Sequence, residues 1–160
     1  MADAEKKIKD PDKEIKIVNT NINHLDDIIE IEKLSFSIPW SRNAFLEELQ
    51  NNRFAVYISA MANEKVVGYA GMWKIIDEGH ITNIAVHPEY RRMGIGKKLL
   101  EELISISRKS GITRMTLEVR KSNTAAQSLY VKYGFKPAGI RKEYYADNGE
   151  DAIIMWKENL

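Results

Sequence analysis

The spacing of hydrophobic residues changes several times along this chain, and each change marks an expected element. Ile15 and Ile17 alternate with charged residues, which predicts a short strand. Apolar residues then recur at helical spacing over Ile22–Leu34, and Pro39 disfavours continuation of that helix. Ser41 is a favourable N-cap for a second helix over 42–50. The first third of the chain therefore predicts one strand and two helices.

The middle of the chain has the pattern of a β-meander followed by a helix. Three strand-like runs are joined by short turns, at Phe54–Ala60, Lys65–Trp73 and His80–His87. Short connections favour antiparallel pairing. An amphipathic helix follows over Gly96–Lys109, and Gly111 is its expected C-terminal stop.

The last third returns to a strand, a short helix and two strands. Residues alternate over Thr113–Arg120, and Asn123 caps a helix that reaches Tyr133. Two strands, Phe135–Tyr145 and Asp151–Glu158, flank an Asn-Gly turn, which predicts a hairpin. We expect an α/β (α+β) fold with one mixed seven-stranded sheet and about four helices. Residues 14–160 form this domain, and residues 1–13 are expected to be a flexible charged tail.

Composition excludes several classes of function. The chain has 160 residues, with 24 basic and 23 acidic side chains, so we expect no general attraction to nucleic acid or membranes. Its longest near-apolar run, Val66–Trp73, is too short to span a bilayer. The absence of cysteine excludes disulfides, cysteine-ligated metals and a thioester on the enzyme. The three histidines lack metal-ligand spacing, and His24 and His87 are interpreted as surface residues. We expect no metal and a cytoplasmic location.

The segment after the third meander strand carries the strongest chemical signal. Arg91–Lys98 is basic, contains two glycines and precedes the start of a helix. Such a segment can bind phosphate through backbone N–H groups, although a tight turn with solvated charges is an equally good interpretation in isolation. It does not match GxxxxGK[ST] or GxGxxG, which disfavours a P-loop NTPase or a Rossmann dehydrogenase.

The pattern Arg91-x-x-Gly94-x-Gly96 resembles the acyl-CoA loop of the GNAT acetyltransferases. The resemblance extends from about Ile15 to Glu158. More specifically, the chain resembles the protein N-terminal acetyltransferases of the RimI and archaeal Ard type. The segments that carry this likeness are Pro39–Ser41, Asn83–Val86, Leu117–Arg120, Ser122–Asn123, Leu129–Tyr130, Gly134–Phe135, Tyr144–Tyr145 and Asp151–Met155.

This resemblance implies acetyl-CoA as the donor and direct transfer to an amine. The family holds the pantetheine between two splayed strands and the pyrophosphate in the loop. The residues that the resemblance assigns to the donor are Ile84, Ala85, Val86, Arg91, Arg92, Met93, Gly94, Ile95, Gly96, Lys97 and Asn123. Asn123 is also interpretable as a plain helix N-cap.

By the same resemblance, Glu118 is the general base and Tyr130 protonates the departing thiolate. An α-amino group has a pKa of about 8, so a modest base is sufficient. From the residues alone, Glu118 is better interpreted as an exposed carboxylate paired with Arg114 or Arg120, and Tyr130 as a core aromatic. Tyr133 is expected to have a packing role only.

Two clusters resemble the loops that clamp the start of the peptide. One contains Phe36, Pro39 and Trp40, and the other contains Tyr144 and Tyr145. Their alternative role is to cover the core. His80 is a further substrate-side candidate that could hold a water, but a surface histidine on an edge strand is an equally good interpretation.

The leading hypothesis is acetyl transfer to the α-amino group of protein N termini starting with Ala, Ser or Met, with ribosomal proteins among the possible substrates. One alternative keeps the donor and changes the acceptor to a lysine side chain or a small amine. Another is a non-catalytic CoA-binding module, against which the presence of both Glu118 and Tyr130 argues. We expect a monomer or a weak homodimer.

Overall fold

The computed structural model describes residues 14–160, so the expected tail at 1–13 lies outside the described residues. Local sequence signals fix most of the boundaries. Ser41 caps the second helix through its side chain, Asn123 caps the last one, and Pro88 follows the end of a strand. The elements are β1 (Ile15–Asn19), η1 (Ile22–His24), α3 (Leu25–Ser35), α4 (Arg42–Gln50), β2 (Ala55–Ala62), β3 (Lys65–Ile75), β4 (Glu78–Val86), η2 (Pro88–Tyr90), α5 (Ile95–Lys109), β5 (Arg114–Arg120), α6 (Thr124–Lys132), β6 (Lys136–Arg141) and β7 (Ala152–Lys157).

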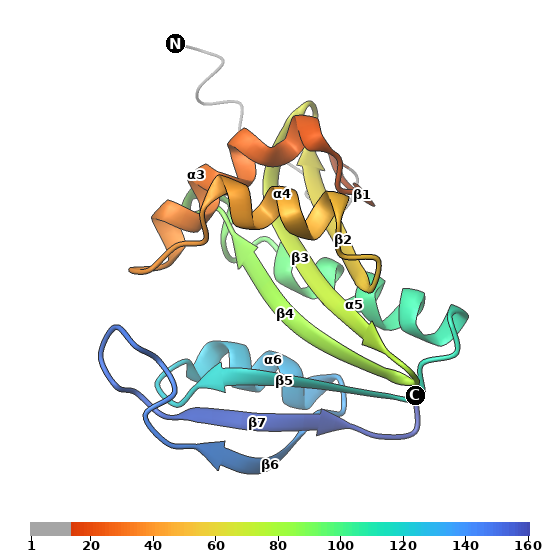
Figure 1. Cartoon of the computed structure of the whole chain (residues 1–160), viewed down its shortest axis with the longest axis vertical. Coiled ribbons are helices and arrows are strands. Elements are labelled where there is room, and N and C mark those ends of the chain that lie inside the picture. The colour runs from red at the N-terminus through yellow and green to blue at the C-terminus, as the bar shows by residue number, and fades with distance from the viewer. Residues whose placement is uncertain (1–13) are drawn as a thin grey trace.

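Within residues 14–160 the strands form one seven-stranded sheet of order β1-β2-β3-β4-β5-β7-β6. Every neighbouring pair is antiparallel except β4 and β5, which are parallel and pair only from Glu78–Arg114 to His80–Thr116. Beyond His80 these two strands diverge, and the sheet opens into two halves (Figure 1). No helix in this part of the chain is long and apolar enough to cross a membrane.

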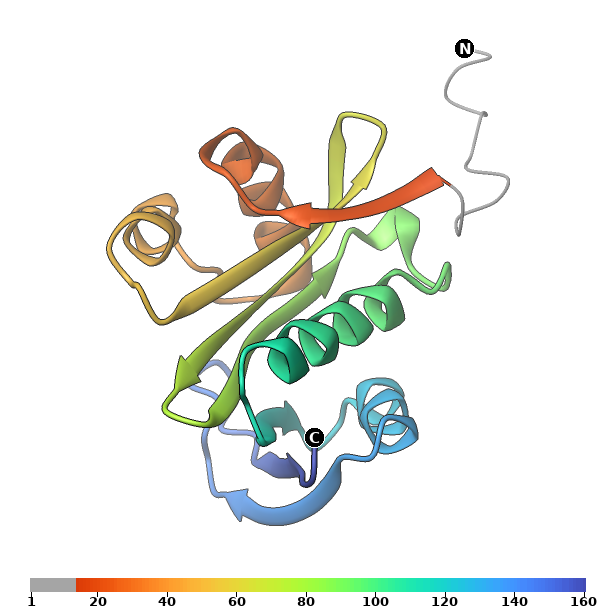
Figure 2. The same ribbon diagram turned by 90° about the vertical axis from the view of Figure 1, so that its right-hand side faces the viewer.

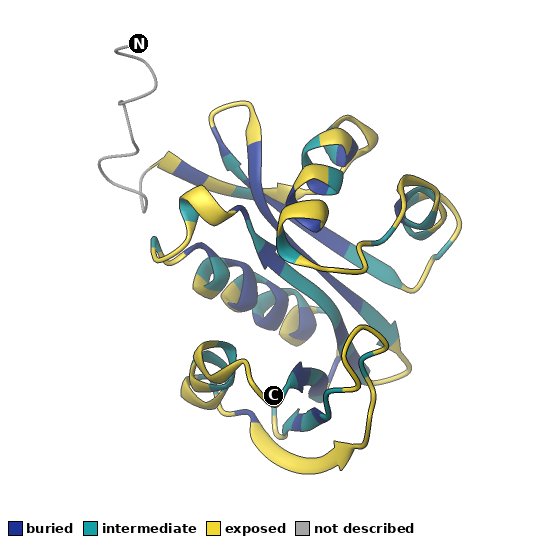
Figure 3. Cartoon of the chain, turned by 90° about the vertical axis from the view of Figure 1, so that its left-hand side faces the viewer, coloured by how far each residue is buried: buried dark blue, intermediate teal, exposed yellow. Residues whose placement is uncertain are grey.

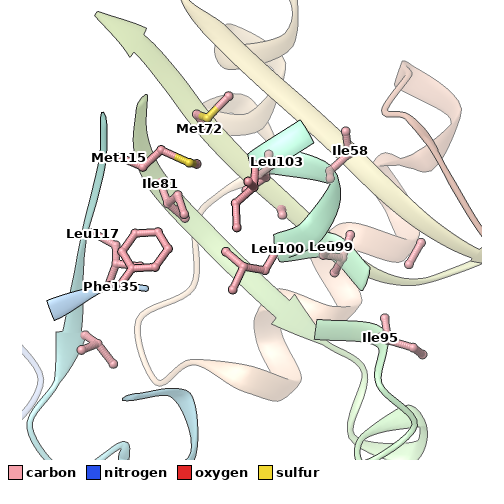
Figure 4. Packing of buried hydrophobic residues seen from close by; sticks show 14 of the residues in the cluster. Ile58, Met72, Ile81, Ile95, Leu99, Leu100, Leu103, Met115, Leu117 and Phe135 are labelled. Carbon is pink, nitrogen blue, oxygen red and sulfur yellow. The ribbon is translucent and has the colours of Figure 1, made fainter. Parts of the chain in front are cut away.

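Helices cover the sheet on both faces. Helices α3 and α4 lie over β2–β4 on one face, whereas α5 and α6 lie on the other (Figures 1 and 2). The main core forms where the apolar stripe of α5, including Leu99, Leu100 and Leu103, packs on Met72 and Ile81 (Figure 4). A Cβ at Gly68 would lie 3.1 Å from Cγ2 of Ile95, so this glycine allows α5 to approach β3 closely.

The last hairpin differs from the sequence-based expectation. Strand β6 ends at Arg141 rather than at Tyr145, and residues 142–151 form a long loop before β7. The Asn148-Gly149 turn lies inside this loop, where Gly149 has φ +72° and donates its N–H to the Tyr145 carbonyl. Because the loop forms hydrogen bonds of its own, the pairing between β6 and β7 ends at Arg141.

The histidines also correct the sequence interpretation. His87 is buried, with 5% of its surface exposed, because Nδ1 accepts the Glu89 N–H and its ring packs edge-on against Tyr90. His24 is partly buried and bonded to Ser59. His80 lies on β4, which is an interior strand and not an edge strand.

Candidate active site

The site is built around the opening between β4 and β5. Ile84, Ala85 and Val86 pair with β3 along one edge, and no strand within residues 14–160 pairs with them on the edge that faces β5. The first turn of α5 lies against the same region on one face of the sheet. A Cβ at Gly96 would lie 4.0 Å from both Val86 on β4 and Leu129 on α6. The end of β4, the start of α5 and α6 therefore meet at the opening.

The loop before α5 has the backbone of an anion-binding turn. Arg92 and Gly94 adopt left-handed conformations, with φ +64° and +77°. Gly94 is the N-cap of α5 and supplies no capping side chain, and the first bond within the helix runs from Lys98 N–H to the Gly94 carbonyl. The N–H groups of Ile95, Gly96 and Lys97 therefore need another acceptor. A bound phosphate would satisfy them, so the residues present fit the pyrophosphate of an acyl-CoA.

The side chains of this loop take different roles. Lys97 and Arg92 are exposed, whereas Met93 packs partly and Ile95 fully into the core. Ile95 can therefore contribute only its backbone to a ligand. Asn123 accepts the Ala126 N–H through Oδ1 at 3.1 Å, which confirms it as a helix cap, and no hydrogen bond from its NH₂ group is described within residues 14–160.

Arg91 is tied to the protein rather than directed only at a ligand. Its Nε donates to the Val86 carbonyl at 3.1 Å, and its Nη2 donates to Oγ of Ser35 at 3.2 Å. The loop is thereby joined to the end of β4 and to the end of α3.

Glu118 lies on β5, on the face opposite α5 and α6. Its neighbours Leu117 and Val119 point into the core, and Glu118 remains partly exposed. Its Oε1 accepts a hydrogen bond from Nε of Arg141 at 3.0 Å. The expected pairing with Arg114 or Arg120 is wrong, because those arginines bond other acids.

Tyr130 lies on α6 and packs against Phe135, with ring centroids 5.9 Å apart. Burial, with a smaller contribution from the neighbouring Tyr145 phenol, raises the pKa of its phenol to about 12. Tyr145 also interacts electrostatically with Glu118. Tyr133 does not have a packing role only, since its hydroxyl donates to Glu101 at 2.8 Å.

The loop between α3 and α4 presents one aromatic residue outward and one inward. Phe36 is exposed, as is Pro39. The Trp40 ring instead packs on Phe45 with centroids 5.2 Å apart, and the Trp40 backbone N–H donates to the buried carboxylate of Glu32 at 3.0 Å. The Trp40 indole therefore packs against a second hydrophobic cluster, which includes Phe45 and Tyr69, and this contact anchors the loop.

The loop over residues 142–151 carries the two tyrosines. Their rings pack edge-on at 5.1 Å, with Tyr144 exposed and Tyr145 partly buried. Each ring has an arginine partner. Arg141 lies 6.0 Å from the Tyr144 centroid and Arg120 lies 4.0 Å from the Tyr145 centroid. Burial raises the pKa of Tyr145 to about 12.

His80 lies apart from these loops. Its Nε2 contacts Oε1 of Glu78 at 2.9 Å, and its ring packs edge-on against Trp156. It is opposite Thr116 on β5, where β4 and β5 are still paired. The structure therefore places it on the same face as Glu118 but at the closed end of the opening.

Sequence reasoning missed four residues that organise the site, namely Ser37, Arg141, Asp147 and Glu150. The alternation along β5 places Arg120 on the face of Glu118, which is a usable signal. No local pattern could have linked it to Asp147.

Comparisons with known proteins agree with this geometry. Residues 25–135 match the acetyltransferase (GNAT) family, and the chain belongs to that family. A Bacillus subtilis protein provisionally named ribosomal protein bS18-alanine N-acetyltransferase is 44% identical over 86% of this chain and 91% of its own length. An N-alpha-acetyltransferase of Sulfurisphaera tokodaii is 34% identical over 89% of this chain and 92% of its own.

Solved structures give the same result. The ribosomal-protein-S18-alanine N-acetyltransferase from Escherichia coli superposes with a TM-score of 0.83 and 36% identity, covering 91% of this chain and 94% of that one. The PaiA N-acetyltransferase from Thermoplasma acidophilum, solved in complex with coenzyme A, has a TM-score of 0.76 and 26% identity, covering 90% and 98%. The family and the fold class expected from the sequence are confirmed.

Proposed function

We propose that the protein transfers acetyl from acetyl-CoA to the α-amino group of protein N termini, with Ala, Ser and Met among the accepted first residues. The observation that carries this proposal is the position of Glu118 on β5, beyond the last β4–β5 pair, where the two strands have diverged and β4 presents the edge of residues 84–86 to the opening. The names of the relatives support the same acceptor class, and ribosomal proteins are candidate substrates.

The donor is held by groups on the side of α5. The N–H groups of residues 95–97 bind its pyrophosphate, with Arg92 and Lys97 adding positive charge. The unpaired edge of β4 at residues 84–86 binds its pantetheine amides, and Asn123 contributes its NH₂ group. Arg91 shapes the loop through Val86 and Ser35. The bound donor supplies an acetyl thioester to the opening.

Glu118 acts as the base, directly or through one water. Arg141 holds Oε1 of its carboxylate, which leaves Oε2 to accept the proton that the α-ammonium must lose. The amine nitrogen then forms the new bond to the acetyl carbon, and the carbon–sulfur bond breaks. An α-amine loses this proton more easily than a lysine side chain, whose pKa is about 10.4.

Tyr130 donates its phenolic proton to the departing sulfur. The amine nitrogen releases a second proton to water as it becomes an amide, and water restores the proton of Tyr130. Its pKa of about 12 keeps the phenol protonated at neutral pH, so it is available as a donor. The start of the peptide contacts Phe36 and Pro39 of the α3–α4 loop, and Tyr144 and Tyr145 of the 142–151 loop. Trp40 positions the α3–α4 loop through its packing on Phe45.

A mass-spectrometric acetylation assay tests this function. Acetyl-CoA is supplied with peptides that begin Ala, Ser, Thr, Met-Leu, Met-Glu or Asp, beside an N-blocked peptide that contains lysine. Acetylation confined to free N termini supports the proposal, and the ranking separates a restricted enzyme from a broad one. Acetylation of only the blocked peptide would overturn the acceptor. Donor binding without any product would favour a small-amine enzyme or a binding module.

A further inference from the structure

The loop over 142–151 is organised around Arg120. Its Nη2 donates to Oδ2 of Asp147 at 2.8 Å, and its Nη1 donates to Oε1 of Glu150 at 3.2 Å and to Oδ1 of Asn148 at 3.3 Å. The guanidinium also lies over the Tyr145 ring, 4.0 Å from its centroid. A single side chain on a strand therefore holds the loop along most of its length.

Further bonds keep these acids in place. The second oxygen of Glu150 accepts the backbone N–H of Ser122 at 2.6 Å. Hydrogen bonds from the Ser122 hydroxyl and from its backbone N–H hold the pKa of Glu150 below its usual value, and hydrogen bonds from Ser37 and Arg120 do the same for Asp147. Both carboxylates are thus ionised at neutral pH, as pairing with Arg120 requires.

Asp147 also connects the loop to the other half of the sheet. The oxygen that Arg120 holds, Oδ2, accepts a hydrogen bond from Oγ of Ser37 at 2.5 Å. Ser37 lies between α3 and α4, next to Phe36. The α3–α4 loop and the 142–151 loop approach each other from opposite sides of the opening (Figure 1), and both are largely exposed (Figure 3). The Ser37–Asp147 bond, which we call the latch, therefore joins these two loops across the opening.

We propose that Arg120 is a positioning residue for the peptide substrate, and that the latch it supports closes over the first residues of a bound N terminus. This inference rests on the proposed function. An exposed single hydrogen bond opens and closes readily. Arg120 holds two acids and stacks on Tyr145, so the loop keeps its shape while the latch opens to admit a chain end.

Arg114 provides a matched control for Arg120. It lies on the same strand and the same face, pairs with Glu158 at 2.8 Å and stacks on Trp156 at 3.9 Å. It has the same chemistry as Arg120 but does not contact residues 142–151 in any interaction described for residues 14–160.

The test compares Arg120→Gln, Arg120→Lys and Arg114→Gln by steady-state kinetics and by hydrogen exchange. We expect Arg120→Gln to raise the KM for peptide about tenfold while the KM for acetyl-CoA stays within about twofold. Exchange in 142–151 should become faster, with exchange in α5 unchanged. Arg120→Lys should restore the peptide KM only partly towards the wild-type value, because lysine lacks the planar guanidinium that bonds several acceptors at once. Arg114→Gln should behave as wild type in both measurements.

The latch is tested by Ser37→Ala. We expect a rise of about threefold in the KM for peptide with no change in loop exchange, because only one exposed bond is lost. In the Arg120→Gln background Ser37→Ala should add nothing, since Asp147 is already displaced. An unchanged peptide KM in Arg120→Gln, or full additivity of the two substitutions, would overturn the inference.

Failure of the proposed function gives a different result. If the wild-type protein acetylates no free N terminus, the acceptor assignment falls. Hydrogen exchange alone then decides the role of Arg120: faster exchange in 142–151 for Arg120→Gln but not Arg114→Gln supports it, and equal exchange overturns it.

Discussion

Nε of Arg141 donates to Oε1 of Glu118 at 3.0 Å, although β7 lies between the strands that carry them. Arg141 is opposite Ala152 on β7, whereas Glu118 is opposite Ile154, so the bond runs diagonally across β7. One carboxylate oxygen is fixed by this bond, and within residues 14–160 no hydrogen bond to the other oxygen is described. Glu118 is therefore oriented and still able to accept a proton.

Glu118→Gln should remove the general base and keep the local geometry, because the glutamine side-chain oxygen can still accept the hydrogen bond from Arg141. We expect kcat to fall by about 10²-fold or more, the usual scale for losing a general base. Titration calorimetry should show unchanged acetyl-CoA affinity. Glu158→Gln is the control, since Glu158 also accepts from an arginine, Arg114, and lies away from the opening. Unchanged turnover in Glu118→Gln would remove the base assignment.

The same bond predicts an effect of Arg141→Gln. Loss of one partly exposed charge-assisted hydrogen bond corresponds to about 1 kcal/mol, or roughly a fivefold fall in kcat/KM. In the Glu118→Gln background the substitution should have almost no effect, because there is no base left to orient. Equal effects in both backgrounds would show that Arg141 acts independently of Glu118.

Gly94 and Gly111 form a matched pair for testing the donor loop. Both have left-handed backbones, with φ +77° and +79°, and a Cβ at either position meets nothing within 4 Å. Alanine at either site should therefore cost a similar free energy of unfolding, about 1 kcal/mol. Only Gly94→Ala should weaken acetyl-CoA binding, because only Gly94 caps the helix whose N-terminus is proposed to bind the pyrophosphate. Thermal denaturation and calorimetry separate these effects, and equal donor affinity in the two variants contradicts the assignment.

Much of the fold could be predicted because its signals are local. Ser41 and Asn123 cap helices that begin where their spacing predicts, and the alternation over β5 correctly places Glu118 opposite the core. Boundaries failed where distant contacts decide them. The pattern over Phe135–Tyr145 predicts one strand. In the structure, Asp147 and Glu150 of the 142–151 loop accept hydrogen bonds from Arg120 and Ser122, so β6 ends at Arg141.

The sequence proposes residues for the candidate site, but it could not supply their pairings. A loop motif identified Gly94 and Gly96, since backbone conformation and helix position are encoded within a few residues. The partner of Glu118 was not predictable, because Arg141 is 23 positions away and reaches it across another strand. His87 illustrates the converse: a histidine beside Pro88 suggests a surface turn, yet it caps η2 and packs on Tyr90.

Tyr130→Phe should lower kcat by about 10²-fold by removing the proton donor to sulfur, whereas Tyr133→Phe should lose only an exposed bond to Glu101. Burial raises the pKa of Tyr130 to about 12 from an ordinary 10.0. Wild-type turnover should therefore not decline through Tyr130 ionisation between pH 8 and 10. A pH profile of kcat checks this, and equal slowing by the two substitutions would deny Tyr130 a special role.

Glu32 gives a prediction about pH and stability. Its carboxylate is buried and accepts hydrogen bonds from Trp40 N–H and from the Tyr69 hydroxyl. Burial raises its pKa above the usual value of 4.5, and the two hydrogen bonds only partly offset this. The folded protein therefore holds the Glu32 proton more tightly than the unfolded chain does. Its contribution to stability is fully present below pH 4.5 and is lost as the pH rises through the folded pKa.

Glu32→Gln removes this titration while keeping an acceptor for Trp40. The free energy of unfolding of Glu32→Gln, relative to wild type, should increase from pH 4 towards pH 7 and then level off, as measured by urea unfolding at several pH values. Glu32→Ala is the contrasting variant. It leaves the Trp40 N–H without its acceptor at a cost of about 1–3 kcal/mol, and it should raise the KM for peptide by loosening the α3–α4 loop. If the free energies of unfolding of Glu32→Gln and wild type differ by the same amount at every pH, Glu32 does not titrate with a raised pKa.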